Sequence, residues 1–166
     1  MKSIIVIIPY FGSLPNYFNL WLSSCRYNST IDWLLMTDNE VSICSSFPAN
    51  VRVQTITWEQ MREKVQRIFD FRIALDTPYK LCDFKPAYGE IFREDVLGYD
   101  FWAYGDMDVI YGDIRKFITD ELLSKYDRCL ACGHLSLIRN VEAVNTIYKN
   151  VGDKCFYYKA VFSSPD

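Results

Sequence analysis

Asp106 and Asp108, separated by one residue, are the feature of this sequence that points most directly to chemistry. They follow Gly105 and residues 101–104, whose aromatic composition is typical of a buried strand. Side chains two positions apart in extended backbone point the same way, so we expect both carboxylates to converge at the carboxyl end of that strand. Two neighbouring anions repel each other unless a cation lies between them or one of them binds a proton. The spacing therefore favours a site for a hard divalent cation, Mg²⁺ or Mn²⁺.

A plain structural interpretation of the two aspartates is a solvated turn after a strand. Gly105 and the apolar residues on both sides favour the metal site, because they place the pair at the rim of a sheet. Asp113, a few residues further on, fits a helix cap better than a third metal ligand.

Few other residues offer a metal site or a nucleophile. The chain has one histidine and six cysteines, at positions 25, 44, 82, 129, 132 and 155. Cys129 and Cys132 form a CxxC pair, but without a second pair four zinc ligands cannot be assembled with a familiar spacing. Residues 128–133 also resemble a strand, whereas a thioredoxin-type pair opens a helix. We therefore expect ordinary buried thiols.

Composition restricts the class of protein. The 166 residues are 50% hydrophobic, enough for one well-buried domain over residues 1–166. The net charge is -3 and no block of Lys and Arg occurs, so nucleic acid is not an expected partner. The apolar run at residues 4–8 ends at Pro9 and is too short for a signal-peptide core or a transmembrane segment. We expect a soluble cytoplasmic protein, and a peripheral association with the inner face of the membrane remains open.

The pattern of apolar residues predicts strands that alternate with helices. The predicted strands are residues 3–8, 31–37, 51–56, 101–104, 129–132 and 135–138. The first predicted helix has a core stripe of Tyr17, Phe18, Trp21, Leu22 and Cys25. The second begins with a Thr57–Gln60 capping box and has an apolar face that reaches Phe69. The others are a helix over residues 85–96, one from Asp113 to Leu122, and a last one capped by Asn140. Such alternation predicts an α/β fold with a Rossmann-like, mostly parallel sheet flanked by helices. Ligands bind such sheets beyond the carboxyl ends of the strands.

Four segments resemble the GT-A class of nucleotide-sugar-dependent glycosyltransferases, and more narrowly the bacterial enzymes of capsular and surface-polysaccharide synthesis that carry a DxD motif. These segments are the opening strand with Pro9, the second strand ending in Asp38, the run Lys85-Pro-Ala-Tyr88, and the run Tyr104-Gly-Asp106-Met-Asp108-Val-Ile-Tyr-Gly-Asp113. The resemblance spans nearly the whole chain. Enzymes of this class are usually longer, so the resemblance implies either an N-terminal fragment of a longer enzyme or a short or degenerate member.

The resemblance implies a role for individual residues. Asp108 would ligate the metal directly, and Asp106 would contact the ribose or donor sugar and help to hold the metal. The other residues that would bind the nucleotide sugar are Pro9, Tyr10, Phe11, Asp38, Asp83, Lys85, Tyr104 and Gly105. His134 and Ser136 would lie on the acceptor side. In this class a later segment often supplies a histidine ligand, but His134 is too near the fifth strand for us to give it that role, and no catalytic base is assigned.

Several of these residues also have a plain structural interpretation. Asp38 could simply close a turn with Asn39, and Lys85 could be a solvent-facing helix residue. His134 could be a hydrogen-bonded loop histidine. Tyr10 and Phe11 could cover the core, although aromatic rings in a loop at a strand end suit stacking on a base or sugar.

The function implied by the resemblance is transfer of a sugar from a nucleoside-diphosphate sugar to a glycan or lipid-linked acceptor. A metal held by two carboxylates would neutralise the charge of the departing diphosphate, and Lys85 would add a positive charge beside it. One alternative is a pseudo-glycosyltransferase that binds nucleotide or glycan without turnover. A weaker alternative is a haloacid-dehalogenase-type phosphatase, in which the DxD motif normally follows the first strand.

Overall fold

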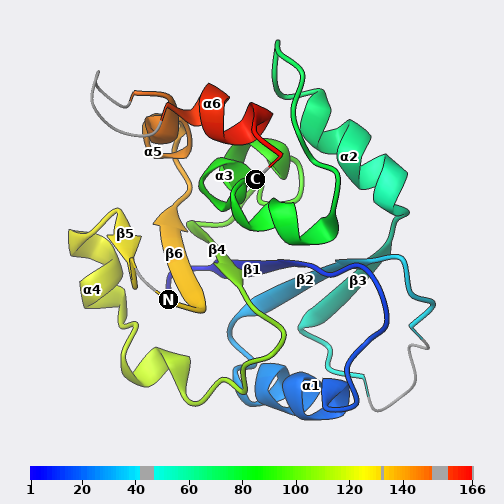
Figure 1. Cartoon of the computed structure of the whole chain (residues 1–166). Coiled ribbons are helices and arrows are strands. Elements are labelled where there is room, and N and C mark those ends of the chain that lie inside the picture. Colours follow the sequence, from blue (N-terminus) through cyan, green and yellow to red (C-terminus); the bar gives the residue numbers. More distant parts are fainter. Residues whose placement is uncertain (42–46, 132, 151–156, 166) are drawn as a thin grey trace.

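The fold is α/β, with a six-stranded mixed sheet flanked by helices (Figure 1). The computed structural model describes residues 1–41, 47–131, 133–150 and 157–165. Within them the strands are β1 (Ile4–Pro9), β2 (Asp32–Thr37), β3 (Val51–Thr55), β4 (Phe101–Gly105), β5 (Arg128–Cys129) and β6 (Leu135–Arg139). The strand order across the sheet is β3-β2-β1-β4-β6-β5.

The sheet has a parallel part and an antiparallel part. β1 pairs in parallel with β2 on one side and with β4 on the other, and β2 pairs in parallel with β3. β6 runs antiparallel to both β4 and β5. Within the sheet, the chain passes from β1 to β2 and β3 on one side of β1, and later returns to form β4 on the other side of β1. A ligand crevice is expected where the strand order reverses in this way, at the carboxyl ends of β1 and β4.

Both faces of the sheet are covered, which explains why β1 is apolar at successive positions. Ile5 and Ile7 face one core, and Ile4, Val6 and Ile8 face the other. The first core lies beneath α2 (Trp58–Gln66), η1 (Pro78–Cys82), η2 (Lys85–Ala87), α3 (Tyr88–Ile91), α5 (Glu142–Asn145), η4 (Ile147–Lys149) and α6 (Tyr158–Ser163). The second core lies beneath α1 (Phe18–Tyr27), η3 (Ile114–Lys116) and α4 (Asp120–Lys125). Figure 1 shows α2, α3 and α6 on one side of the sheet and α1 on the other.

Several predicted elements are confirmed. The strands predicted over residues 3–8, 31–37, 51–56, 101–104 and 135–138 are present to within one residue at each end. Thr57 and Gln60 form the predicted capping box at the start of α2. Asp113 caps η3, and its side chain accepts a hydrogen bond from the Lys116 amide.

Three helix predictions were wrong in extent. The helix predicted over residues 85–96 is a 3₁₀ turn followed by α3, which ends at Ile91. The helix predicted from Asp113 is two elements, because Thr119 caps a separate α4. Asn140 caps no helix; its amide donates to the carbonyl oxygens of Val96 and Tyr99 and holds the end of the 92–99 segment in place.

Two smaller predictions about buried side chains need correction. Trp21 and Cys25 of the predicted stripe are buried, but Tyr17 precedes α1 and is exposed. Of the cysteines, Cys25 and Cys129 are buried as expected, whereas Cys82 is exposed. Cysteines 44, 132 and 155 lie outside the described residues. The strand predicted over 129–132 is β5, which ends at Cys129 ahead of Leu130, whose φ of 59° lies in the left-handed region.

Candidate functional site

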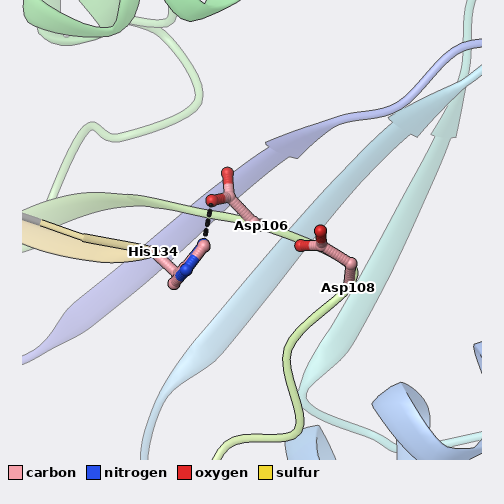
Figure 2. A group of neighbouring side chains, drawn as sticks. All are labelled: Asp106, Asp108 and His134. Carbon is pink, nitrogen blue, oxygen red and sulfur yellow. Dashed lines mark hydrogen bonds and ion pairs between the residues drawn. The ribbon is translucent and has the colours of Figure 1, made fainter.

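Asp106 and Asp108 lie in a turn directly after β4. The strand ends at Gly105, and Met107 and Asp108 are part of a turn, so the expectation of extended backbone here was wrong. The turn nevertheless brings the acids together, because Met107 between them is buried in the core beneath. One ligand atom from each of Asp106, Asp108 and His134 lies within 4.8 Å of the other two. Figure 2 shows the three side chains grouped beside the end of the strand.

His134 reaches this group because β6 runs antiparallel to β4. Gly105, the last residue of β4, pairs with Leu135, the first residue of β6. The residue after β4 must therefore face the residue before β6, and the Asp106 amide donates to the His134 carbonyl oxygen over 3.1 Å. The Nδ1 atom of His134 lies 2.8 Å from Oδ2 of Asp106. Closeness to a strand, which argued against a ligand role for His134, is what places it beside the aspartates.

Tyr111 supports the turn from the core side, although no role for it was predicted from the sequence. Its hydroxyl accepts a hydrogen bond from the Asp106 amide (2.9 Å) and donates one to the Asp106 carbonyl oxygen (2.7 Å). Burial raises the pKa of Tyr111 well above its ordinary value, so the phenol keeps the proton that it donates. A Cβ atom on Gly105 would lie 2.6 Å from this hydroxyl, so a larger residue at the end of β4 would displace the Tyr111 side chain. The position of Tyr111 within the Asp106–Asp113 run was the only signal for it in the sequence.

Lys85, the first residue of η2, forms an ion pair with Asp106. Its Nζ lies 2.8 Å from Oδ1 of Asp106 and 5.1 Å from the centre of the Tyr104 ring. Pro86 at the start of η2 fixes the backbone there. Lys85 is thus a residue of the site, and the interpretation as a solvent-facing helix residue is wrong.

A cleft of about 640 Å³ opens beside the acidic turn, a volume typical of small-molecule sites. Its polar end contains Lys85, Asp106, Asp108 and His134. Its other walls are mainly apolar and aromatic: Ile8, Pro9, Tyr10, Phe11, Tyr17, Pro78, Tyr79, Leu81, Cys82, Tyr88, Gly105 and Met107. The cleft thus lies where the strand order reverses between β1 and β4, as the topology predicts.

Four of the predicted site residues do not line this cleft. Asp38 accepts a hydrogen bond from the Gly12 amide over 3.1 Å, which links the loop after β2 to the loop after β1. Asp83 forms an ion pair with Lys80 instead. The hydroxyl of Tyr104 accepts a hydrogen bond from Arg128, although the Tyr104 ring lies under Lys85.

Ser136 is the fourth of these residues. It has no exposed surface, and its hydroxyl donates to the Leu130 carbonyl oxygen. The sequence could not distinguish these four from the residues of the cleft, because all of them lie at or near the ends of strands and helices. Which of them line the cleft depends on the pairing of strands and on the direction of each side chain.

No helix within the described ranges is long and apolar enough to cross a membrane.

Comparison with known proteins gives one family. Residues 6–166, nearly the whole chain, match the model of a family described as DUF6625, a family of unknown function. A comparison with curated proteins gives no match.

Proposed function

The chain belongs to the DUF6625 family, and from the geometry of its cleft we propose that it is a metal-dependent glycosyltransferase or the donor-binding portion of one. The donor is a nucleoside-diphosphate sugar, and the acceptor is a glycan or a lipid-linked glycan. The GT-A arrangement of the sheet, suggested by the resemblance of the sequence, is part of the same proposal.

The observation that carries the proposal is the group of Asp106, Asp108 and His134 in the cleft beyond β4. Two carboxylates and one imidazole form a donor set that suits Mn²⁺, since carboxylate oxygens favour Mg²⁺ and Mn²⁺ and imidazole favours transition metals. Asp108 and His134 are exposed and Asp106 is partly buried, so an incoming cation can reach all three. The residues therefore fit a divalent cation.

The charge of the cleft explains why a diphosphate ligand would need that cation. The charged side chains that line the cleft, apart from His134, are two carboxylates and one ammonium, which leave one net negative charge. Such a cleft repels a diphosphate, whereas one added dication makes it net positive. When bound, the cation supplies Lewis-acid stabilisation of the negative charge that develops on the leaving diphosphate.

The rest of the cleft suits the nucleoside and the sugar. Tyr10 and Phe11, directly after β1, line the cleft within the same loop. Phe11 is held by an edge-to-face contact with Trp58, with ring centres 5.2 Å apart. Ordered aromatic rings present flat surfaces on which a base or a sugar ring can stack. We assign Pro9, Tyr10 and Phe11 to the nucleoside, and Lys85 to the phosphates.

Calorimetry of the 166-residue chain tests the binding part of the proposal. Titration with Mn²⁺, and then with UDP, GDP, ADP and CDP at saturating Mn²⁺, is expected to show metal binding and metal-dependent binding of at least one nucleotide. Asp108→Asn is expected to weaken Mn²⁺ binding by at least about tenfold, the minimum effect typical of residues that support a metal site. Asp113→Asn is the matched control, because asparagine can also cap η3 and Asp113 lies outside the three-residue group. Equal Mn²⁺ affinity in both variants would contradict the proposed site.

A separate assay tests turnover. Incubation with nucleotide sugars of the base that binds, with Mn²⁺, is expected to release the nucleoside diphosphate, and Asp108→Asn is expected to abolish the release. Metal-dependent nucleotide binding without any release or transfer would instead identify a non-catalytic binding protein.

A further inference from the structure

Both oxygen atoms of the Asp106 carboxylate already have a partner. Nζ of Lys85 lies 2.8 Å from Oδ1, and Nδ1 of His134 lies 2.8 Å from Oδ2. The Lys85 side chain is 19% exposed and that of Asp106 is 29% exposed, so their pairing is only partly screened by water. Lys85 thus occupies one side of a carboxylate that the proposed metal site needs.

A dication and an ammonium compete for such a carboxylate. Two positive groups held against one anion repel each other at short range, and that repulsion is weakened little where water is partly excluded. Asp108, the other carboxylate of the group, has no ion pair among the described residues of the chain. Binding of a dication would therefore weaken the Lys85–Asp106 pair in particular.

The ammonium that leaves Asp106 does not leave the cleft. Lys85 is fixed at its backbone by η2, and its Nζ lies over the Tyr104 ring, which gives the charge a second favourable contact. A diphosphate that binds beside the metal would offer the freed ammonium a new anionic partner, and hydrogen bonds between charged groups are among the strongest in proteins.

We propose that Lys85 is an exchangeable counter-ion that neutralises Asp106 in the metal-free protein and transfers to the diphosphate of the ligand when the metal binds. This inference rests on the proposed function and deepens it, since it makes binding of metal and diphosphate mutually dependent. By linkage, the metal raises the affinity for diphosphate by the same factor by which diphosphate raises the affinity for metal.

Substitution of Lys85 by methionine tests both the competition for Asp106 and the binding of the diphosphate. Methionine retains much of the apolar stem of the lysine side chain and removes its charge. Mn²⁺ alone is expected to bind Lys85→Met roughly 3- to 10-fold more tightly than wild type, since its competitor for Asp106 is gone. UDP, and GDP in a parallel titration, are expected to bind the Mn²⁺-saturated variant at least about tenfold more weakly. The two changes have opposite signs, which misfolding or simple loss of the site would not produce.

Two variants serve as controls in the same calorimetric titrations. Lys85→Arg keeps the charge and is expected to bind Mn²⁺ as wild type does. Lys116→Met removes an exposed charge that does not line the cleft and is expected to leave both affinities unchanged. Thermal unfolding of each variant verifies that it is folded.

The outcomes distinguish this inference from the function on which it rests. Mn²⁺ affinity that is unchanged or lower in Lys85→Met would overturn the competition for Asp106. Unchanged nucleotide affinity in that variant would overturn the transfer of the ammonium to the diphosphate. Absence of Mn²⁺ binding by the wild-type chain would overturn the proposed function itself, and this inference with it.

Discussion

The hydroxyl of Tyr111 forms hydrogen bonds with both backbone polar groups of Asp106, at 2.9 Å from the Asp106 nitrogen and 2.7 Å from the Asp106 carbonyl oxygen. A side chain thereby fixes the peptide groups on both sides of an acidic residue that lies in a turn. The tilted contact between the rings of Trp33 and Tyr111, with centres 4.9 Å apart, holds the phenol in place. The geometry of the acidic group therefore depends on a buried residue that no ligand would touch.

Tyr111→Phe is expected to destabilise the protein by about 1 to 2 kcal/mol, because the Asp106 carbonyl oxygen loses its hydrogen-bond donor in a partly buried place. Urea unfolding measures this change. Mn²⁺ affinity should fall as well, because the turn that carries Asp106 and Asp108 is then less well ordered. Tyr27→Phe, at an exposed tyrosine on α1, is the control and should have no effect.

Gly105→Ala is expected to cost about 1 to 3 kcal/mol, the usual range for an extra methyl group in a packed core. The new Cβ atom would lie 2.6 Å from the Tyr111 hydroxyl and 3.2 Å from side chains of Val6 and Ile8. Combining Gly105→Ala with Tyr111→Phe should cost less than the sum of the two single changes, since the phenylalanine removes the closest contact. Gly112→Ala is the control, because its Cβ would meet no atom within 4 Å. Simple additivity would contradict the predicted clash.

Asn145→Ala is expected to destabilise the protein by about 1 to 3 kcal/mol, because it leaves the buried indole N–H of Trp102 without its acceptor. In the folded protein this group donates to Oδ1 of Asn145 over 2.7 Å. Chemical denaturation followed by tryptophan fluorescence measures the loss. Asn150→Ala, at an exposed asparagine, should be close to neutral.

Asp100 is expected to make stability depend on pH in the acid range. A hydrogen bond from the Ser3 amide, together with contacts from the Ser3 hydroxyl and Lys2, lowers the pKa of Asp100 below its ordinary value. A lowered pKa in the folded state stabilises the protein above the pKa of the unfolded chain, about 3.9, and this contribution is lost as the pH falls through the folded value.

Asp100→Asn should therefore be less stable than wild type at neutral pH, by about 1 kcal/mol or less because the side chain is 40% exposed. The difference should narrow as the pH falls below about 4. Unfolding curves of both proteins between neutral pH and pH 3 check this. A difference that stays constant over the whole range would rule out the carboxylate as its origin.

Features that depend on near neighbours in the chain were predictable from the sequence. The continuous apolar residues of β1 predict a strand buried on both faces, and the Thr57–Gln60 box and the Asp113 cap each need only a residue three positions away. The prediction of a helix over residues 85–96 was wrong because the end of this segment depends on a residue that is distant in the chain. Asn140, more than forty residues further on, bonds the carbonyl oxygens of Val96 and Tyr99 and holds that end in turns.

The sequence by itself determined that two aspartates follow a buried strand of an α/β sheet, since composition and spacing are local properties of the chain. Only the tertiary structure decided what surrounds them. The antiparallel pairing of β4 with β6 places His134 beside Asp106, and the packing of η2 against β4 places Lys85 on its other oxygen. Such neighbours lie 21 and 28 residues away along the chain. They are fixed by strand order and register, which long-range packing selects and no local pattern encodes.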